Sequence, residues 1–169
     1  MSYILGGEEI MSNIRRYKQD GYVYFVTTNT YSRREIFREQ WACEFLRSII
    51  AYYKFIFKFK LYSYCIMPEH VHMIIQTLSK QYDISTIMKE IKGTFGREFN
   101  ILIRKKGNIW QRKFYDSVIR NNRDLIVKIN YIFENPVRKN IVKNPTQYKF
   151  SSARSYLLGQ NDYITDIYN

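Results

Sequence analysis

The sequence predicts an α+β domain with one antiparallel β-sheet and helices packed on one face of that sheet. Segments of strand-like and helix-like hydrophobic period follow one another in the order strand, helix, strand, strand, helix, strand. Hydrophobic residues make up 46% of the 169 residues, which suffices for a sizeable core and excludes an intrinsically disordered chain. Glycine (7 residues) and proline (3 residues) are too few for a low-complexity linker, so we expect a single domain over residues 1–169.

Residue type and spacing indicate the first four elements. A run of β-branched and aromatic residues after Gly21 is typical of a strand. Trp41, Phe45 and Ile49 then recur at helical spacing. Two strand-like segments on either side of Pro68 indicate an antiparallel hairpin. We therefore expect a strand over residues 22–28, a helix over 39–54, and strands over 57–66 and 70–78.

Capping residues indicate the two later helices. Asp83 or Ser85 is placed to cap the first of them, whose apolar residues form a single stripe. Asn121 or Asn122 is placed to cap the second, and Pro136 is expected to end it. We therefore expect a helix over residues 84–100, a strand over 115–120 and a helix over 123–135.

This order of elements predicts the ferredoxin-like, or split βαβ, arrangement followed by one more helix near the C-terminus. Its sheet is antiparallel, and its two crossover helices cover one face. Residues 1–20 read as an irregular lead-in, and residues 141–169 form a C-terminal tail with weak local signals. A fold of this kind hosts many activities, so function has to be argued from particular residues.

The charge of the chain points to an anionic partner. Lys and Arg number 27 against 15 Asp and Glu, which makes the formal net charge +12. Basic residues alternate with aromatic residues that can stack on bases, so nucleic acid is the leading partner class. The most apolar stretch, residues 45–59, is interrupted by Arg47, Lys54 and Lys58 and is too short to span a membrane. Two cysteines do not build a disulfide framework.

The only two histidines, His70 and His72, stand two residues apart in a predicted strand. Residues i and i+2 of a strand share one face, so the imidazoles lie side by side on the face opposite apolar Val71 and Met73. Such a pair suits two ligands of one divalent cation. Zinc would require a further His, Cys or carboxylate, whereas Mg²⁺ or Mn²⁺ accepts an oxygen donor. Two ordinary strand histidines remain the alternative.

The last predicted helix carries a tyrosine on its polar face. Leu125, Ile129 and Ile132 form the apolar stripe, and Tyr131 falls nearly opposite. Asn135 is its i+4 neighbour, so both side chains reach one spot. A phenol is a potential nucleophile, and an amide oxygen suits a hard metal ion. With 16 tyrosines in the chain, a chance placement of one on a polar face is the alternative.

Several phrases occur together in a specific order and spacing, above all MPEHVHMII and YIFENPVRKN. From about Gly21 to Tyr156 the chain resembles the single-tyrosine HUH transposases of insertion sequences. The closest branch is the REP-associated tyrosine (IS200-like) type, where REP denotes repetitive extragenic palindromes. The resemblance implies a DNA transposase that cleaves and rejoins hairpin-bearing single-stranded DNA through a 5′-phosphotyrosine. It also implies that Tyr131, on a C-terminal catalytic helix, is the nucleophile.

The same resemblance assigns the metal site and the partners. His70 and His72 look like the metal-binding pair, and Asn135 stands where related enzymes often have Gln as the third ligand. Mg²⁺ or Mn²⁺ is the implied cofactor, and single-stranded or hairpin DNA the partner. Glu69 is expected on the opposite strand face, where it either supports a metal ligand indirectly or takes no part. The protein would act in the cytoplasm of a bacterial or archaeal cell, as a monomer or a homodimer.

Basic and aromatic residues around these motifs are the expected DNA contacts. They are Arg33, Arg34, Lys89, Lys92, Trp110, Gln111, Arg112, Lys113 and Lys128. A non-catalytic nucleic-acid-binding module of similar topology is the competing interpretation, and a zinc-stabilised structural domain is a third.

Overall fold

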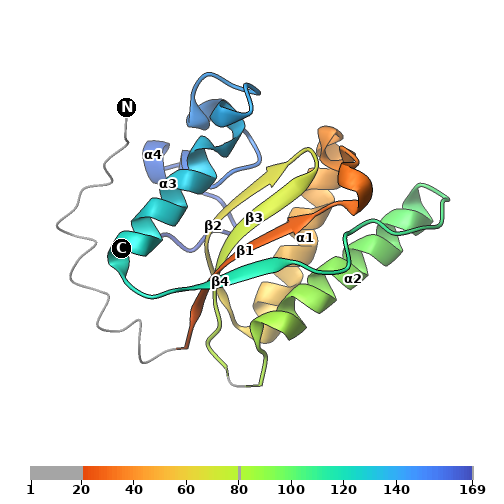
Figure 1. Ribbon diagram of the computed structural model, residues 1–169, viewed down its shortest axis with the longest axis horizontal. Helices are drawn as coiled ribbons and strands as arrows, with labels where there is room; N and C mark the ends of the chain where they lie inside the picture. The colour runs from red at the N-terminus through yellow and green to blue at the C-terminus, as the bar shows by residue number, and fades with distance from the viewer. Residues whose placement is uncertain (1–20, 80, 169) are drawn as a thin grey trace.

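The computed structural model describes residues 21–79 and 81–168, so the expected lead-in over residues 1–20 lies outside the described residues. Four strands form one sheet of order β2-β3-β1-β4, in which every neighbouring pair is antiparallel. The strands are β1 (Val23–Asn29), β2 (Lys60–Met67), β3 (His70–Gln76) and β4 (Tyr115–Ile119). The helices are α1 (Gln40–Phe57), α2 (Ile84–Leu102), α3 (Asn122–Arg138) and α4 (Ala153–Leu158) (Figure 1). The ferredoxin-like prediction is confirmed.

The two faces of the sheet pack against different helices (Figure 1). Val71, Met73 and Ile75 of β3 point into a core that α1 and α2 cover. Ile74 of the same strand points the other way, into a second core shared with α3 and α4. The alternation expected for β3 is therefore present, and it puts the histidine face under α3. None of the helices in the described ranges is long and apolar enough to cross a bilayer.

The junction between α1 and β2 differs from the sequence prediction. The helix continues to Phe57, and the strand begins only at Lys60. Lys58 adopts a left-handed conformation with φ of 55°, which ends the helix. The alternating Phe57-Lys58-Phe59-Lys60 pattern suggested a strand, but both phenylalanines reach the core from a helix end and the link after it. Short apolar runs do not distinguish the two structures.

Helix α3 also continues beyond its expected end, passing through Pro136 to Arg138. A proline inside a helix removes one backbone hydrogen bond. Here it stands in the last turn, where Lys139 N–H still donates to the Asn135 carbonyl at 3.1 Å and Ile141 N–H to the Pro136 carbonyl at 2.9 Å. The extra turn keeps Asn135 inside the helix, directly one turn after Tyr131.

The tail after residue 140 packs against the sheet despite its weak local signals. It contains two short 3₁₀ and α segments, Pro145–Gln147 and α4. Ile66 N–H donates to the Phe150 carbonyl at 2.9 Å, and Ser152 N–H donates to the Tyr64 carbonyl at 3.0 Å. These bonds satisfy backbone groups along the outer edge of β2, which would otherwise be exposed.

Candidate active site

The two histidines lie on the central strand β3 and are almost fully buried, with 5% of His70 and 4% of His72 exposed. Their ring centroids are 4.7 Å apart. In the sheet register His72 faces Thr27 of β1 on one side and Cys65 of β2 on the other. Because β3 is hydrogen-bonded on both edges, the backbone under this pair is held rigidly.

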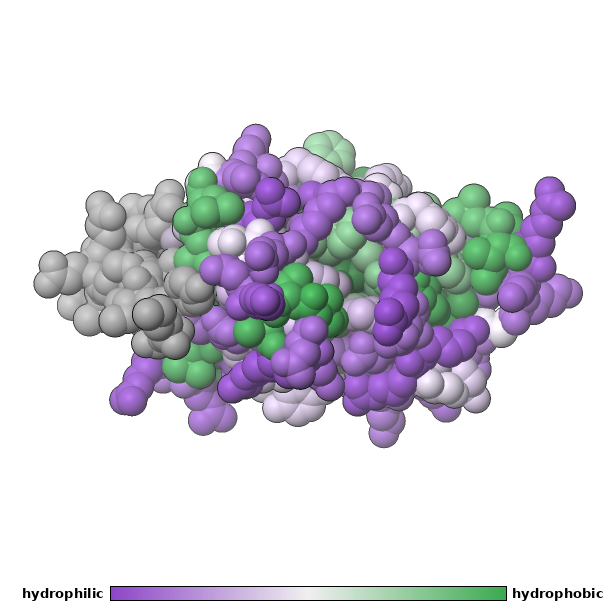
Figure 2. All heavy atoms as spheres, turned by 90° about the horizontal axis from the view of Figure 1, so that it is seen from above, coloured by the Kyte–Doolittle hydropathy of each residue, from purple (hydrophilic) through white to green (hydrophobic). Residues whose placement is uncertain are grey.

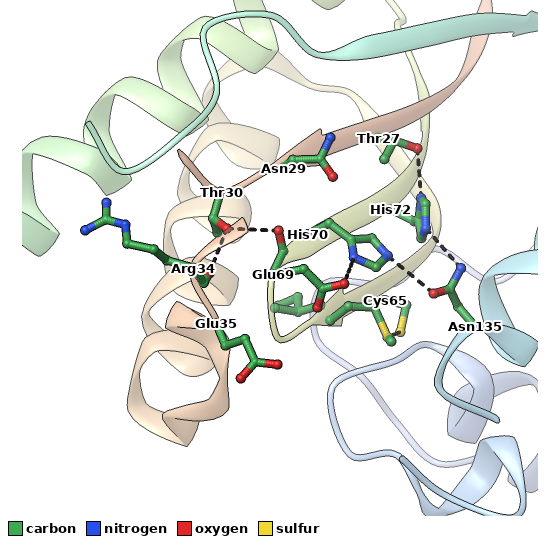
Figure 3. Close-up of polar contacts among 12 residues, drawn as sticks. Thr27, Asn29, Thr30, Arg34, Glu35, Cys65, Glu69, His70, His72 and Asn135 are labelled. Atoms are coloured by element: carbon green, nitrogen blue, oxygen red, sulfur yellow. Dashed lines mark hydrogen bonds and ion pairs between the residues drawn. The ribbon is translucent and has the colours of Figure 1, made fainter. Parts of the chain in front are cut away.

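Helix α3 brings Asn135 between the two imidazoles (Figure 3). Its Oδ1 lies 3.3 Å from His70 Nε2, and its Nδ2 lies 3.0 Å from His72 Nε2. The asparagine is only 5% exposed. The structure thus brings together the three side chains that the sequence singled out as metal ligands, from two elements more than sixty residues apart.

Two further side chains hold the outer nitrogens of the imidazoles. The Glu69 carboxylate lies 3.1 Å from His70 Nδ1, and Thr27 Oγ1 lies 2.8 Å from His72 Nδ1. A carboxylate accepts only, so His70 donates Nδ1–H to Glu69 and keeps its Nε2 lone pair towards Asn135. The expectation that Glu69 points to the opposite face is wrong, because Glu69 belongs to the turn before β3 and strand alternation does not apply to it.

Burial keeps both imidazoles neutral. Removal from water lowers the pKa of His72 to about 3, with smaller contributions from the neighbouring His70 and Lys128. Removal from water also lowers the pKa of His70, and the Glu69 carboxylate partly opposes that shift. A neutral imidazole carries the lone pair with which histidine binds a metal ion.

The donor set fits a divalent cation. With its Nδ1 proton given to Glu69, His70 presents a lone pair at Nε2 to the Asn135 amide oxygen, which is also an acceptor. A cation between such atoms would replace this repulsion with two favourable contacts. In the described ranges no three His, Cys, Asp or Glu side chains are placed to hold a metal ion together, so a third donor beside the two histidines would be the Asn135 amide oxygen. Such a set departs from the usual zinc ligands and suits Mg²⁺ or Mn²⁺.

Tyr131 lies beside the histidine pair of its own chain. Its ring centroid is 5.4 Å from that of His72 and 5.9 Å from that of Phe25, with the rings close to perpendicular. The Arg138 guanidinium lies 5.5 Å from the tyrosine ring centre. The side chain is 37% exposed and lines a cavity of about 380 Å³ together with both histidines and Asn135. The tyrosine is therefore packed on one side and open to a ligand on the other.

Some of the expected DNA contacts lie at this cavity, and others are exposed elsewhere on the surface. Arg33 lines this cavity, and Lys128 Nζ lies 4.6 Å from the centre of the Phe25 ring, at the same site. Exposed side chains farther away are Lys89, Arg112 and Lys113. Seen from above, much of the molecular surface is hydrophilic, with separate hydrophobic patches (Figure 2). The basic residues are thus available to an anionic ligand over a broad area.

Other expected contacts have structural partners. The Lys92 ammonium donates to the carbonyls of Gln111 and Arg112, at 2.9 and 3.3 Å, and burial lowers its pKa. The Arg34 guanidinium donates to the Asn108 carbonyl. The Gln111 side-chain oxygen accepts from Asn29 at 3.4 Å, and Asn29 lines the cavity. These side chains position the segment that leads into β4.

Trp110 does not have the exposed position that stacking on a base would require. Only 9% of it is exposed, and its ring packs 5.5 Å from that of Phe37 and 5.4 Å from that of Phe95. The indole lies close to Gly96 of α2, at a distance where an added Cβ would make an ordinary van der Waals contact of 3.8 Å with its Cδ1. A tryptophan in a basic, non-periodic segment suggested a surface position, whereas the tertiary fold closes α2 over it.

Sequence reasoning missed five residues of the site, namely Phe25, Thr27, Asn29, Arg138 and Lys139. Phe25, Thr27 and Asn29 share a face of the first strand, but the register that places this face beside the histidines has no local signal. Lys139 was missed because the helix was expected to end near Pro136. Arg138 was missed for the same reason.

The sequence model of the family described as "Transposase IS200 like" matches residues 18–135. The chain belongs to the IS200-like transposases. The matched range ends at Asn135, so it includes both histidines and Tyr131.

A sequence relative and a solved structure indicate which type of IS200-like transposase the chain resembles. The chain is 32% identical over 143 residues to the REP-associated tyrosine transposase of Escherichia coli (strain K12), covering 84% of this chain and 82% of the relative. It also superimposes on a solved structure described as a REP-associated tyrosine transposase bound to a REP hairpin. That match has a TM-score of 0.72 and 28% identity, and covers 87% of this chain and 86% of the other. This transposase is therefore similar to the REP-associated type over most of its length.

Proposed function

We propose that this transposase binds a DNA hairpin and cleaves and rejoins the adjoining single strand through Tyr131, with Mg²⁺ or Mn²⁺ as cofactor. The observation that supports this most directly is the position of the Tyr131 ring, 5.4 Å from His72. Asn135, one turn later on the same helix, meets both imidazoles. A packed nucleophile and a set of metal donors thus line one cavity of suitable size.

The proposed chemistry exchanges one phosphoester bond for another. The Tyr131 oxygen attacks the scissile phosphorus, the bond between phosphorus and the 3′ oxygen breaks, and a 5′-phosphotyrosyl bond forms. The phenol gives its proton to solvent, and the departing 3′ oxygen takes a proton from solvent. Rejoining is the reverse attack by a 3′-hydroxyl, so no nucleotide triphosphate is needed.

The residues around the cavity have distinct roles in this proposal. Nε2 of His70, Nε2 of His72 and Oδ1 of Asn135 would hold the metal ion. When bound, it would polarise the phosphate and neutralise developing charge, a contribution of several kcal/mol. Phe25 and His72 orient the tyrosine ring through edge-to-face contacts. Arg33 and Lys128 attract the phosphates of the strand.

A single copy of the chain supplies all of these groups. Tyr131 and the histidines meet within one chain, so the site does not need a helix from a second copy. We therefore propose that the monomer is the catalytic unit.

The direct test is covalent capture of DNA. The protein is incubated with labelled REP-type hairpin DNA carrying single-stranded arms, together with Mn²⁺. We expect an adduct that survives boiling in detergent, and we expect Tyr131→Phe to abolish it. The matched control is Tyr115→Phe, because Tyr115 lines the same cavity but comes from β4 and not from α3. An adduct that persists in Tyr131→Phe would contradict the assignment, and hairpin binding without any adduct would favour a non-catalytic binding module.

A further inference from the structure

A second cavity, of about 550 Å³, lies beside the proposed active site. Glu69 and Lys139 both line it. Lys139 also lines the cavity that holds Tyr131, so the two cavities adjoin at this side chain. Figure 3 shows Glu69 and Asn135 on opposite sides of His70, with Glu35, another residue of the second cavity, farther out on the Glu69 side.

The residues of the site follow one another along α3 and β3. Tyr131 contacts His72, Asn135 lies between His72 and His70, and Lys139 lies at the second cavity. Tyr131 and Asn135 of α3 and Lys139, the residue directly after α3, are spaced four apart, so each step along the helix axis is about 6 Å. Along β3 the order is the same, because Glu69 comes directly before His70 and borders the second cavity. The second cavity is therefore at the end of the site away from Tyr131.

This order has a consequence for the scissile strand. In phosphoryl transfer the attacking and leaving oxygens lie roughly in line, on opposite sides of the phosphorus. If the Tyr131 oxygen attacks, the leaving 3′ oxygen points away from Tyr131. The nucleotide that carries this oxygen then lies towards Glu69, Lys139 and the second cavity.

The lining of the second cavity suits a nucleobase with its phosphate. Half-buried Tyr148 supplies aromatic surface, to which the almost fully buried Phe37 and Phe150 add only a small area. The exposed Gln40 amide can both donate to and accept from a base edge. The two acidic residues have partners, since Glu35 pairs with Arg38 and Glu69 with His70. Lys139 forms no ion pair with any residue in the described part of the chain and is exposed, so its charge is available to a phosphate.

We propose that this second cavity binds the base of the nucleotide immediately 5′ of the scissile phosphate. This base cavity would hold the cleaved strand by the nucleotide that bears the free 3′-hydroxyl, so that the hydroxyl stays in place for rejoining. The proposal rests on Tyr131 acting as the nucleophile, and it assigns a recognition role to residues that the chemistry does not use.

The test combines removal of single bases with filling of the cavity. Ile141, which is 44% exposed and lines the base cavity, is changed to Trp. The matched control is Ile56→Trp, since Ile56 is 41% exposed but lies near the far end of α1. Binding of a REP-type hairpin with single-stranded arms is measured by fluorescence anisotropy, in the Tyr131→Phe background, with an abasic site at each arm position in turn. Adduct mapping with wild-type protein gives the cleaved bond.

We expect one abasic position, directly 5′ of the cleaved bond, to weaken binding about tenfold in the wild-type cavity. In Ile141→Trp, intact DNA binds about tenfold more weakly and the same abasic site has no further effect. Ile56→Trp binds intact and abasic DNA as the protein with the unfilled cavity does. In Gln40→Ala, which adds no bulk, the abasic site at the same position weakens binding by a smaller factor.

Each other result separates this inference from the proposed function. Suppose that the adduct forms, but that every abasic site weakens binding to Ile141→Trp as it does to the unfilled protein, or that the abasic site with the lost effect lies 3′ of the cleaved bond. The base cavity is then refuted, and the proposed cleavage by Tyr131 stands. If one position responds to Ile141→Trp but wild-type protein forms no adduct, the base cavity is supported and the cleavage proposal fails.

Discussion

The two faces of β3 carry different kinds of interior. Met73 and its neighbours on one face are sealed by α1 and α2 in an apolar core. His70 and His72 on the other face are just as buried, yet their nitrogens meet the polar side chains of Glu69, Thr27 and Asn135. Burial is nearly equal, so burial alone does not mark the functional face. What marks it is a set of buried polar groups that converge from separate elements on a cavity.

Replacing a histidine should produce the largest effect on activity. In His72→Ala the proposed metal site would lose a ligand that contributes to several kcal/mol of charge stabilisation, so adduct formation should fall by more than about a hundredfold. The rate of adduct formation with hairpin DNA and Mn²⁺ measures this. Full activity in His72→Ala would contradict the functional role of the histidine face of β3.

The adjacent residue on the opposite face should show the reverse pattern. Met73→Ala leaves a cavity in the apolar core and should lower the free energy of unfolding by about 2–5 kcal/mol. Urea denaturation measures the loss. Mn²⁺ binding by the folded protein should be unchanged, and a weakened Mn²⁺ affinity would show that the two faces are coupled.

The outer contact of His70 should matter less than the histidine itself. Glu69→Ala removes the acceptor of the Nδ1 proton and should weaken Mn²⁺ binding about 10- to 100-fold, as measured by isothermal titration calorimetry. Glu69→Gln should recover part of this loss, because an amide oxygen still accepts from Nδ1–H. Glu35→Gln is the control, since Glu35 pairs with Arg38 at the surface. Equal effects in Glu69→Ala and Glu35→Gln would contradict a positioning role.

Acid should destabilise the histidine face selectively. Burial holds the pKa of His72 at about 3, below its value of about 6.5 in the unfolded chain. The unfolded state therefore binds the proton first, and stability is lost as pH falls below about 6.5. For the metal-free protein we expect His72 to lower the free energy of unfolding by about 1–2 kcal/mol when the pH falls to about 5. Urea denaturation of wild type and His72→Gln, above pH of about 6.5 and at pH of about 5, measures the loss of stability in each protein. An equal loss in both proteins would refute the role of His72.

The smallest effect is expected far from both interiors. Lys89→Ala removes one exposed charge on α2, so hairpin affinity should fall slightly and uniformly for different sequences. The slope of log affinity against log salt should decrease by about one. Anisotropy titrations at several salt concentrations measure both, and an unchanged slope would exclude Lys89 from the contact.

Local sequence patterns determined which residues share a face of each element. The spacing of His70 and His72 in an extended segment puts both on one side of the strand, and the four-residue spacing of Tyr131 and Asn135 puts both on one side of the helix. The order of elements then predicted the ferredoxin-like sheet. These inferences hold because strand and helix periods are properties of the backbone and do not depend on distant contacts.

Tertiary structure alone decided how those faces meet. It turned Glu69 towards His70, set Thr27 against His72, closed α2 over Trp110 and carried α3 through Pro136 so that Lys139 adjoins two cavities. The physical reason is that each of these outcomes depends on strand register, turn geometry or packing between segments far apart in the chain. Such contacts are selected by the energy of the whole core and leave no signature in the local sequence.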